Sequence, residues 1–509
     1  MSPDLDAAPG IVAVVVVTVA TLAIGTWGLR FSRTTSDFFV ASRSVNPRLN
    51  ASAIGGEYLS AASFLGVAGL VLTFGADMLW YPIGWTAGYL VLLVLVAAPL
   101  RRSGAYTLPD FAEARLGSRG VRAACSVLVV AIGWLYLLPQ FQGAGLTLRS
   151  AVGAPVWTGP VIVGLVVLIN VTSGGMRSIT FVQAFQYWLK LTALLVPLLV
   201  LLAVWAGDGA PGSRVVGAAA GGWSVPLADG GGQGLYLTYS LIVATFLGTM
   251  GLPHVVVRFY TNPDGRAARR TTLVVLALLG AFYLLPPAYG ALGRAYAPEL
   301  AASGRSDVLV LELPRLMVPG ALGDVLTGLV TAGAFAAFLS TSSGLAIAVA
   351  GVLSQDVTGR SWGGRRLGGV AAFRAGAAVA VLVPVLVALA TPHVGVARAV
   401  GLAFAVAAST FCPLLLLGIW WPRLTDAGAV AGLAVGGLGS GAAVAWTLAP
   451  TTATGWTGVL LEQPAAWSVP LAFAAMVGVS LLTPGRVPVH TRRLMVRLHT
   501  PEAVDLDRG

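Results

Sequence analysis

The sequence has few of the side chains that catalytic and metal sites most often use. Its 509 residues include four histidines and two cysteines, and only 10% of the residues are charged. The histidines and cysteines are scattered and show no metal-ligand spacing. No glycine-rich loop ends in Lys-Ser or Lys-Thr, which argues against an ATP-driven pump. We therefore expect that the chain is not an enzyme.

The sequence also lacks a polar stretch large enough for a soluble domain. Hydrophobic residues make up 57% of the chain, and its mean hydropathy is +0.84. Apolar runs of about 20 residues, the length that crosses a bilayer, recur from Ile11 to Thr483. These features predict one all-α membrane domain over residues 1–484 and a cytoplasmic tail over 485–509. We expect thirteen spans, near residues 11–29, 50–73, 79–100, 124–148, 158–173, 182–206, 235–256, 271–293, 321–353, 371–391, 398–421, 428–449 and 467–484.

Arginine is distributed unequally between the two sets of loops. One set and the tail hold most arginines, and cytoplasmic loops are the ones that keep positive charge. This predicts a multi-pass protein of the cell membrane with its N-terminus outside and its C-terminus in the cytoplasm. The net charge of +11 is thus a topology signal, and we expect no nucleic-acid partner. The opposite side holds only Arg149, Arg214, Arg294, Arg305, Arg315 and Arg398.

The predicted span 321–353 contains a cluster of neutral oxygens. In the segment AFAAFLSTSSG, the Ala337 carbonyl and the hydroxyls of Ser340 and Thr341 share one helical face, because their spacing is i, i+3 and i+4. Neutral oxygens inside an apolar helix suit a hard cation of low charge such as sodium. This pattern favours an ion-coupled transporter.

A predicted helix break lies in the second span, where Gly55 and Gly56 precede Glu57. Non-helical backbone at membrane depth is tolerated where it lines a cavity or is buried in protein. Freed carbonyls of Gly56 and Leu59 would then face the hydroxyls of span 321–353 and complete a five-oxygen sodium site. The alternative is that the glycines serve close packing and that Glu57 reaches the interface.

The seventh span contains a second candidate break. Gly248, Gly251 and Pro253 lie close together, and proline removes a helical hydrogen bond. His254 follows, either as a packing residue or as a substrate contact. Breaks five spans apart are expected for two inverted repeats, here near residues 50–206 and 235–421.

Other polar residues also lie inside predicted spans. Gln140 lies beside Pro139 and is expected to face a cavity, together with Gln142. Lys190 lies one turn after Gln186, and we expect it to bond to a neighbouring helix or to extend its ammonium toward the membrane interface. Gln183 belongs to the same segment.

Several segments resemble the sodium:solute symporter family, most closely its cation/acetate and monocarboxylate branch. The resemblance covers roughly residues 34 to 480. Its motifs are DFFVASRSV, GGEYLSAASFLG, SGGMRSITFVQAFQYWLK, LGTMGLPHVVVRFYTNPDGRAARRT and AFAAFLSTSSG.

The resemblance implies a leucine-transporter-like fold with two inverted five-helix repeats, one preceding helix and two following helices. It also implies a sodium site on Gly56, Leu59, Ala337, Ser340 and Thr341. Two positions depart from the family pattern: Glu57 replaces an aspartate of acetate-type members, and Gln183 replaces an aspartate that sugar- and proline-type relatives carry.

We therefore expect sodium-coupled uptake of a small monocarboxylate such as acetate by alternating access. The expected partners are this organic anion, the sodium ion and the lipid bilayer, and the oligomeric state is left open. Two alternatives remain: proton coupling through Glu57, because an intramembrane carboxylate can carry a proton, and a transporter-like solute sensor. The expected substrate contacts are Ser63, Gln140, Thr249, Gly251 and His254.

Overall fold

The protein was analysed as a computed structural model of the whole chain. The structure describes residues 8–28, 41, 44–212, 222–227, 231–356, 369–391, 395–449, 454–502 and 504. Within these ranges the chain is helical and contains no β-strand. The predicted all-α class is confirmed.

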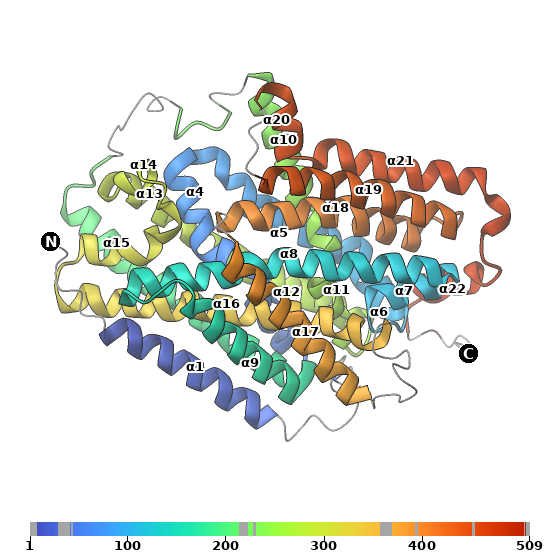
Figure 1. The fold of residues 1–509 in the computed structure, drawn as a ribbon, viewed down its shortest axis with the longest axis horizontal. Coiled ribbons are helices and arrows are strands. Elements are labelled where there is room, and N and C mark those ends of the chain that lie inside the picture. Colours follow the sequence, from blue (N-terminus) through green and yellow to red (C-terminus); the bar gives the residue numbers. More distant parts are fainter. Residues whose placement is uncertain are drawn as a thin grey trace.

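Figure 1 shows the helices of the chain, coloured in sequence order. Several are interrupted by short π or 3₁₀ segments, labelled η. The elements of the first half are α1 (Ala8–Gly28), α3 (Pro47–Tyr58), η3 (Ala62–Gly66), α4 (Val67–Phe74), η4 (Gly75–Leu79), α5 (Trp80–Val91), η5 (Leu92–Val96), α6 (Ala97–Arg102), α7 (Leu108–Leu116), α8 (Arg119–Val152) and α9 (Thr158–Gly207).

The second half of the chain begins with α10, which is followed directly by the short helix α11. Its elements are α10 (Gly232–Gly251), α11 (Pro253–Val257), η7 (Arg258–Thr261), α12 (Gly265–Tyr283), α13 (Leu285–Tyr296), α14 (Glu299–Ala302), η8 (Ser306–Val308), α15 (Leu309–Met317), α16 (Ala321–Asp356), α17 (Gly369–Ala390), α18 (Val396–Trp420), α19 (Asp426–Leu448), α20 (Gly455–Glu462), α21 (Ala465–Leu482), η9 (Pro484–Arg486) and α22 (Thr491–His499).

Eleven helical segments in the described ranges are long and apolar enough to cross a membrane, and two of these segments each contain parts of two of the thirteen predicted spans. The difference has two causes. The predicted spans 158–173 and 182–206 lie in one segment, α9, which consists of two helices that meet at a kink at Gly175, where φ is 57° and ψ is −160°. The predicted span 50–73 is divided at its break, and α4 is joined through η4 to α5 in one span over Ala62–Arg102.

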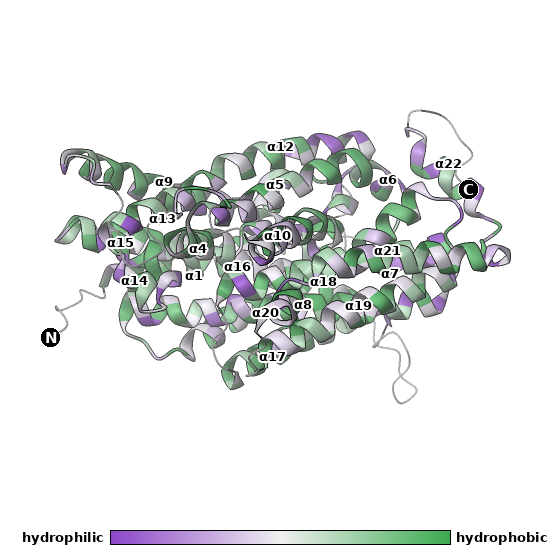
Figure 2. Ribbon diagram, turned by 90° about the horizontal axis from the view of Figure 1, so that it is seen from above, coloured by the Kyte–Doolittle hydropathy of each residue, from purple (hydrophilic) through white to green (hydrophobic). Residues whose placement is uncertain are grey.

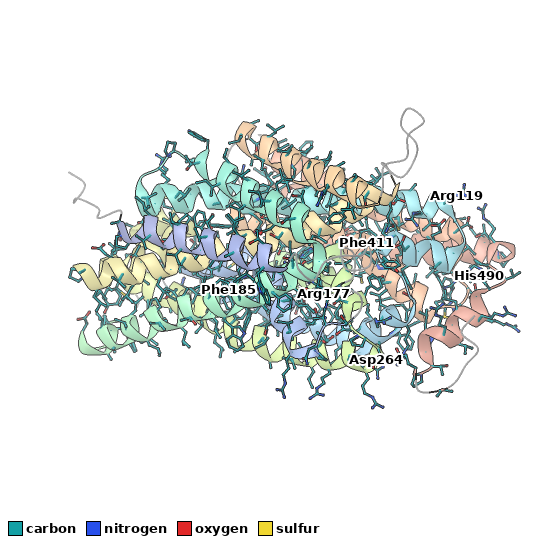
Figure 3. The ribbon with its side chains drawn as sticks, turned by 90° about the horizontal axis from the view of Figure 1, so that it is seen from below. Arg119, Arg177, Phe185, Asp264, Phe411 and His490 are labelled. Carbon is teal, nitrogen blue, oxygen red and sulfur yellow. The ribbon has the colours of Figure 1, made fainter. Side chains whose placement is uncertain are left out.

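The long helices run side by side, and apolar residues predominate along them (Figure 2). Helices α13, α14 and α15 lie at one end of the bundle, and α6, α7 and α22 lie at the other (Figure 1). Arg119 and His490 belong to this second end, whereas Phe185 lies nearer the middle (Figure 3). Polar ends and an apolar middle are what a bilayer-spanning bundle requires.

Helix α16 occupies the centre of the bundle. It packs against α8, α9, α17, α1 and α3, and nearly all its side chains are buried. The two breaks lie close to it, because α3 and α11 also contact α16. The central helix thus brings the polar residues of both breaks together.

Candidate functional site

Helix α3 ends where the sequence predicts a break. Its cap, Leu59, has φ −73° and ψ 83°, and helical structure resumes at Ala61. Two glycines allow α9 to approach the break closely. A Cβ on Gly56 would lie 2.0 Å from the Gln183 carbonyl oxygen, so a side chain at this position is excluded. The backbone near the break is therefore in direct contact with α9.

The ammonium of Lys190 lies between the broken helix and α16. It donates hydrogen bonds to the Gly56 carbonyl, to the Leu59 carbonyl at 2.7 Å and to the Ser340 hydroxyl at 2.9 Å. The side chain is fully buried. Lys190 thus bonds to neighbouring helices, which is one of the two expected arrangements, and it does not extend toward the membrane interface, because its acceptors lie inside the bundle.

The structure brings the five predicted oxygens to the same contact. Three of them accept hydrogen bonds from Lys190. The other two have partners of their own: the Thr341 hydroxyl donates to the Glu57 carbonyl at 2.6 Å, and the Ala337 carbonyl accepts from the Ser340 hydroxyl at 3.1 Å. The oxygens meet as predicted, but three of them accept hydrogen bonds from the Lys190 ammonium.

Glu57 belongs to a buried ionic network. Its carboxylate pairs with Arg258 of η7 at 2.6 Å, and both side chains are nearly inaccessible to solvent. Arg258 also donates to Thr180 at 3.0 Å and to the Gln183 side chain. Gln183 in turn donates to the Ser340 carbonyl at 2.8 Å. Glu57 is therefore a buried ion-pair partner, and it does not extend toward the interface.

A second glycine makes room for this carboxylate. A Cβ on Gly344 of α16 would lie 2.1 Å from the Glu57 carboxyl carbon. The carboxylate lies between α16 and Arg258. It also interacts electrostatically with Lys190. The network contains two cationic side chains and one carboxylate.

The geometry does not fit a sodium ion together with the ammonium. Two unit charges about 4 Å apart repel by about 4 kcal/mol at an effective dielectric constant of about 20. Moreover, the carbonyls of Gly56 and Leu59 and the Ser340 hydroxyl already accept from Lys190. Sodium could use these oxygens only after the lysine side chain had moved away.

The second break separates α10 from α11. Leu252 has φ −73° and ψ 119°, and Pro253 begins α11 without an N–H group to leave unpaired. Gly251 packs tightly against α18, because a Cβ there would lie 2.3 Å from the Ala407 carbonyl oxygen. This predicted substrate residue thus permits a close helix contact.

Several buried polar groups near this break have no hydrogen-bond partner among the described residues. They are both ring nitrogens of His254, Nε1 of Trp85 and the hydroxyl of Tyr89. Buried polar groups are normally paired, so each such group requires an explanation. A bound polar ligand would supply the missing partners.

Aromatic rings connect these groups to the first break. Tyr58 lies 4.8 Å from Tyr89, Trp85 lies 5.6 Å from Phe404, and Tyr136 lies 5.4 Å from His254, all measured between ring centroids. The Phe404 ring also contacts the rings of Tyr58 and Tyr136. We call the following six residues the aromatic cluster: Tyr58, Trp85, Tyr89, Tyr136, His254 and Phe404.

Three predicted substrate residues bond to other protein groups. The Ser63 hydroxyl lies 2.9 Å from the Tyr283 hydroxyl, and Thr249 lies 2.9 Å from the Tyr58 hydroxyl. The Gln140 side chain accepts from the Ala61 N–H, which the break would otherwise leave unpaired, at 3.0 Å. These residues lie beside the breaks, and His254 differs from them in having two unpartnered nitrogens.

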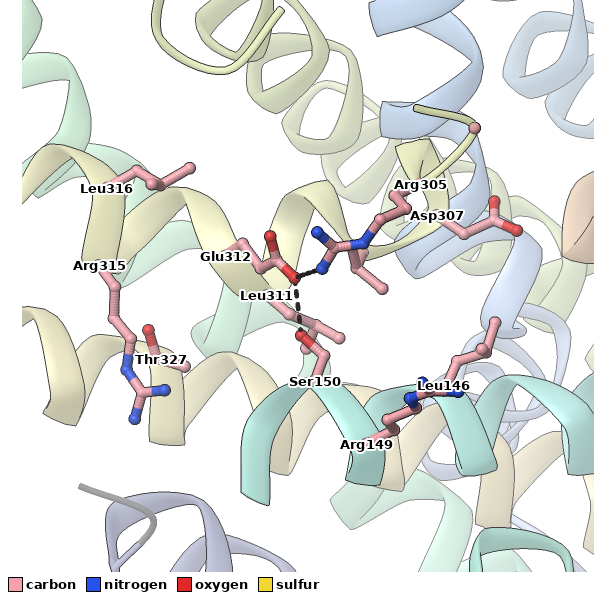
Figure 4. A pocket seen from close by; sticks show the side chains of 12 residues that line it. Leu146, Arg149, Ser150, Arg305, Asp307, Leu311, Glu312, Arg315, Leu316 and Thr327 are labelled. Atoms are coloured by element: carbon pink, nitrogen blue, oxygen red, sulfur yellow. Dashed lines mark hydrogen bonds and ion pairs between the residues drawn. The ribbon is translucent and has the colours of Figure 1, made fainter. Parts of the chain in front are cut away.

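A pocket of about 770 Å³ lies at the end of the bundle that carries α15 (Figure 4). Glu312 projects into it and pairs with Arg305 at 2.5 Å and with Ser150 at 3.2 Å. Arg149 and Arg315 also line it. The predicted substrate residues are not among its lining residues.

Sequence reasoning missed four residues of this region. Arg258 was counted among the loop arginines, although its position five residues after Pro253 of a broken span could have suggested burial. Lys190 was expected to bond to a neighbouring helix or to reach the interface, and it was not placed at the predicted oxygen site. Trp85 and Tyr89 gave no signal, because aromatic residues are common in membrane helices for packing reasons.

Comparisons with known proteins agree with this architecture. Three solved structures are similar: a Na⁺-coupled sialic acid symporter, the nucleobase-cation-symport-1 family transporter Mhp1, and MhsT in complex with L-phenylalanine. Their TM-scores are 0.68, 0.57 and 0.53, with sequence identities of 15%, 14% and 15%. In the same order, the aligned regions cover 93%, 90% and 87% of this chain. They cover 98%, 98% and 99% of the respective solved chains. The fold is the leucine-transporter-like fold of secondary transporters.

The sequence comparisons give the family. The model of the sodium:solute symporter family matches residues 38–436. The uncharacterized symporter YwcA of Bacillus subtilis (strain 168) is 31% identical over 512 residues, covering 94% of this chain and 96% of the relative. The chain belongs to the sodium:solute symporter family.

Proposed function

We propose that this chain is a secondary active symporter that takes up a small organic monocarboxylate, such as acetate, across the cell membrane. The observation that carries the proposal is the set of unpartnered buried groups beside the second break. His254, Trp85 and Tyr89 contribute N–H and O–H donors, and a carboxylate is acceptor-only when ionised. A bound carboxylate would satisfy donors that otherwise remain unpaired.

The aromatic cluster supports a small substrate. Its rings approach one another to between 4.8 and 6.3 Å, which leaves little room for a bulky solute between the breaks. The resemblance to the acetate and monocarboxylate branch supports the same class. Ser63, Gln140, Thr249 and Gly251 are proposed to shape the site rather than to supply its free donors, because each already contacts protein.

Transport is proposed to follow alternating access. The repeats near residues 50–206 and 235–421 would rock relative to each other around the breaks. The N-terminus is proposed to lie outside and the C-terminus in the cytoplasm, because the arginine-rich loops belong to the cytoplasmic side.

The coupling cation has two candidates. The family and the sialic acid symporter support sodium, held by Gly56, Leu59, Ala337, Ser340 and Thr341 as the sequence predicts. The Lys190 contacts favour a second candidate, a symporter that needs no sodium at this position.

Uptake into proteoliposomes tests the substrate class. Purified protein is supplied with labelled acetate, pyruvate or proline under imposed sodium, proton or electrical gradients. Saturable acetate or pyruvate uptake that unlabelled proline does not inhibit is expected. Charge matters for the readout, because moving one charge through 100 mV is worth about 2.3 kcal/mol. Uptake of proline but neither acid would contradict the proposal.

A further inference from the structure

We propose that Lys190 is the resident cation of the contact between α3 and α16, so that this chain neither binds nor requires sodium there. The inference deepens the proposed function, and its transport assay rests on that function. The binding assay does not. The proposal stands on the position of the ammonium, its acceptors and the surrounding charges.

The hydrogen bonds of the ammonium are complete. A lysine ammonium has three donors, and the three acceptors are two carbonyls of the broken helix and one hydroxyl of α16. A sodium ion at the same oxygens would make the same connection between α3 and α16. The lysine therefore supplies the link that a free cation would otherwise supply.

The charges around the site oppose an additional cation. Glu57 of α3 is paired with Arg258 of η7, and Lys190 of α9 is the other charged group that interacts with this carboxylate. The facing side chains of α16 at this contact, Ser340 and Thr341, are neutral. Sodium would add a third positive charge beside one carboxylate in a buried region, where unpaired charge is costly.

The covalent tether makes the ammonium a strong competitor for these oxygens. A linked group binds at an effective concentration that a free ion in dilute solution does not reach. Lys190 lies in the second half of α9, which packs against both α3 and α16. The same helix also carries Gln183 and Gln186.

Sodium binding to purified protein tests the proposal without reference to substrate. Radioactive sodium is titrated against the wild type, Lys190→Ala and the control Gln186→Ala, which removes a neighbouring side chain that bonds to Thr21. We expect no saturable binding to the wild type or the control, and stoichiometric binding to Lys190→Ala. Saturable binding to the wild type that is lost when Ser340 and Thr341 are both changed to alanine would overturn the proposal. Failure of Lys190→Ala to bind sodium would contradict the claim that the ammonium replaces this ion.

Uptake provides the second readout. Initial rates of carboxylate uptake by the wild type are expected to be equal when sodium is replaced by choline, and Lys190→Ala is expected to lose uptake in choline. Strict dependence of the wild type on sodium would overturn the proposal. This wild-type comparison remains decisive if Lys190→Ala does not fold. If the wild type transports no carboxylate in either buffer, the proposed function fails, and sodium binding still decides the role of Lys190.

Discussion

The two helix breaks differ in how their polar groups are satisfied. At the first break, the Gly56 and Leu59 carbonyls accept from Lys190, and the Ala61 N–H donates to Gln140. At the second break, both ring nitrogens of the fully buried His254 have no hydrogen-bond partner within the part of the chain that the structure describes. The protein itself pairs these backbone groups of the first break, although the Glu57 Oε1 atom has no hydrogen-bond partner among the described residues, whereas the second break leaves side-chain groups for a ligand to satisfy.

This difference separates two roles that broken helices can perform. A completed break can be stable in the resting protein, because each freed backbone group has a partner. An incomplete break carries a cost that substrate binding can remove. We therefore expect substitutions at the first break to reduce the stability of the protein and its uptake in the absence of sodium. Substitutions at the second break are expected to change substrate affinity.

The largest effect is expected for Glu57→Gln. This change removes the carboxylate that faces Arg258 and Lys190 and leaves two buried cations, and breaking a buried ion pair typically costs about 3–5 kcal/mol. Uptake should be abolished and the unfolding temperature in detergent should fall. Glu57→Asp is the matched control, because it keeps the charge and should lose less. Unchanged uptake and stability of Glu57→Gln would remove the first break from the account.

His254→Phe should raise the KM for the carboxylate about 10- to 100-fold, because a hydrogen bond to a charged group is worth about 1.5–3 kcal/mol. Stability should not fall, since the change removes two unpartnered nitrogens and keeps a ring beside Tyr136. His254→Gln keeps donors and should be less affected. Uptake kinetics and thermal unfolding measure both effects. A stability loss with an unchanged KM would show that the histidine serves packing.

Gln140→Leu, unlike His254→Phe, should affect stability more than substrate affinity. It leaves the Ala61 N–H buried without a partner, which costs about 1–3 kcal/mol. The unfolding temperature should therefore fall, whereas the KM should change less than in His254→Phe. Gln140→Glu keeps the acceptor oxygen and serves as the control. A large KM increase without a stability loss would instead make Gln140 a direct substrate contact.

Thr341→Val should have the smallest effect. It removes one hydrogen bond to the Glu57 carbonyl, worth about 0.5–1.5 kcal/mol, and Thr341→Ser keeps it. Uptake in choline should persist, because Lys190 does not bond to this hydroxyl in the structure. Loss of a sodium-stimulated component in Thr341→Val, but not in Thr341→Ser, would show that the hydroxyl is a sodium ligand.

The sequence was sufficient to predict the membrane class, both breaks and the meeting of Gly56 and Leu59 with Ser340. These features depend on local signals: apolar run length, Gly-Gly beside a carboxylate, proline after glycine, and hydroxyls at helical spacing. The thirteen predicted spans correspond to eleven continuous segments, because α9 contains two of them on either side of the kink at Gly175, and Ala62–Arg102 contains 79–100 together with part of 50–73.

The occupant of the first break could not be predicted from local pattern. Lys190 is separated by more than a hundred residues from both Gly56 and Ser340, and its spacing from Gln186 is equally consistent with an interfacial lysine. The partner of Glu57 was missed for the same reason. Which charges meet in a helix bundle depends on the rotation and tilt of each helix, and packing determines both.

The most direct test is an experimental structure determined twice, once in sodium chloride and once in choline chloride. We expect the ammonium of Lys190 to remain within hydrogen-bond distance of the Gly56 and Leu59 carbonyls and the Ser340 hydroxyl in both structures. An ion at these oxygens in sodium chloride, with Lys190 displaced from them, would contradict this expectation.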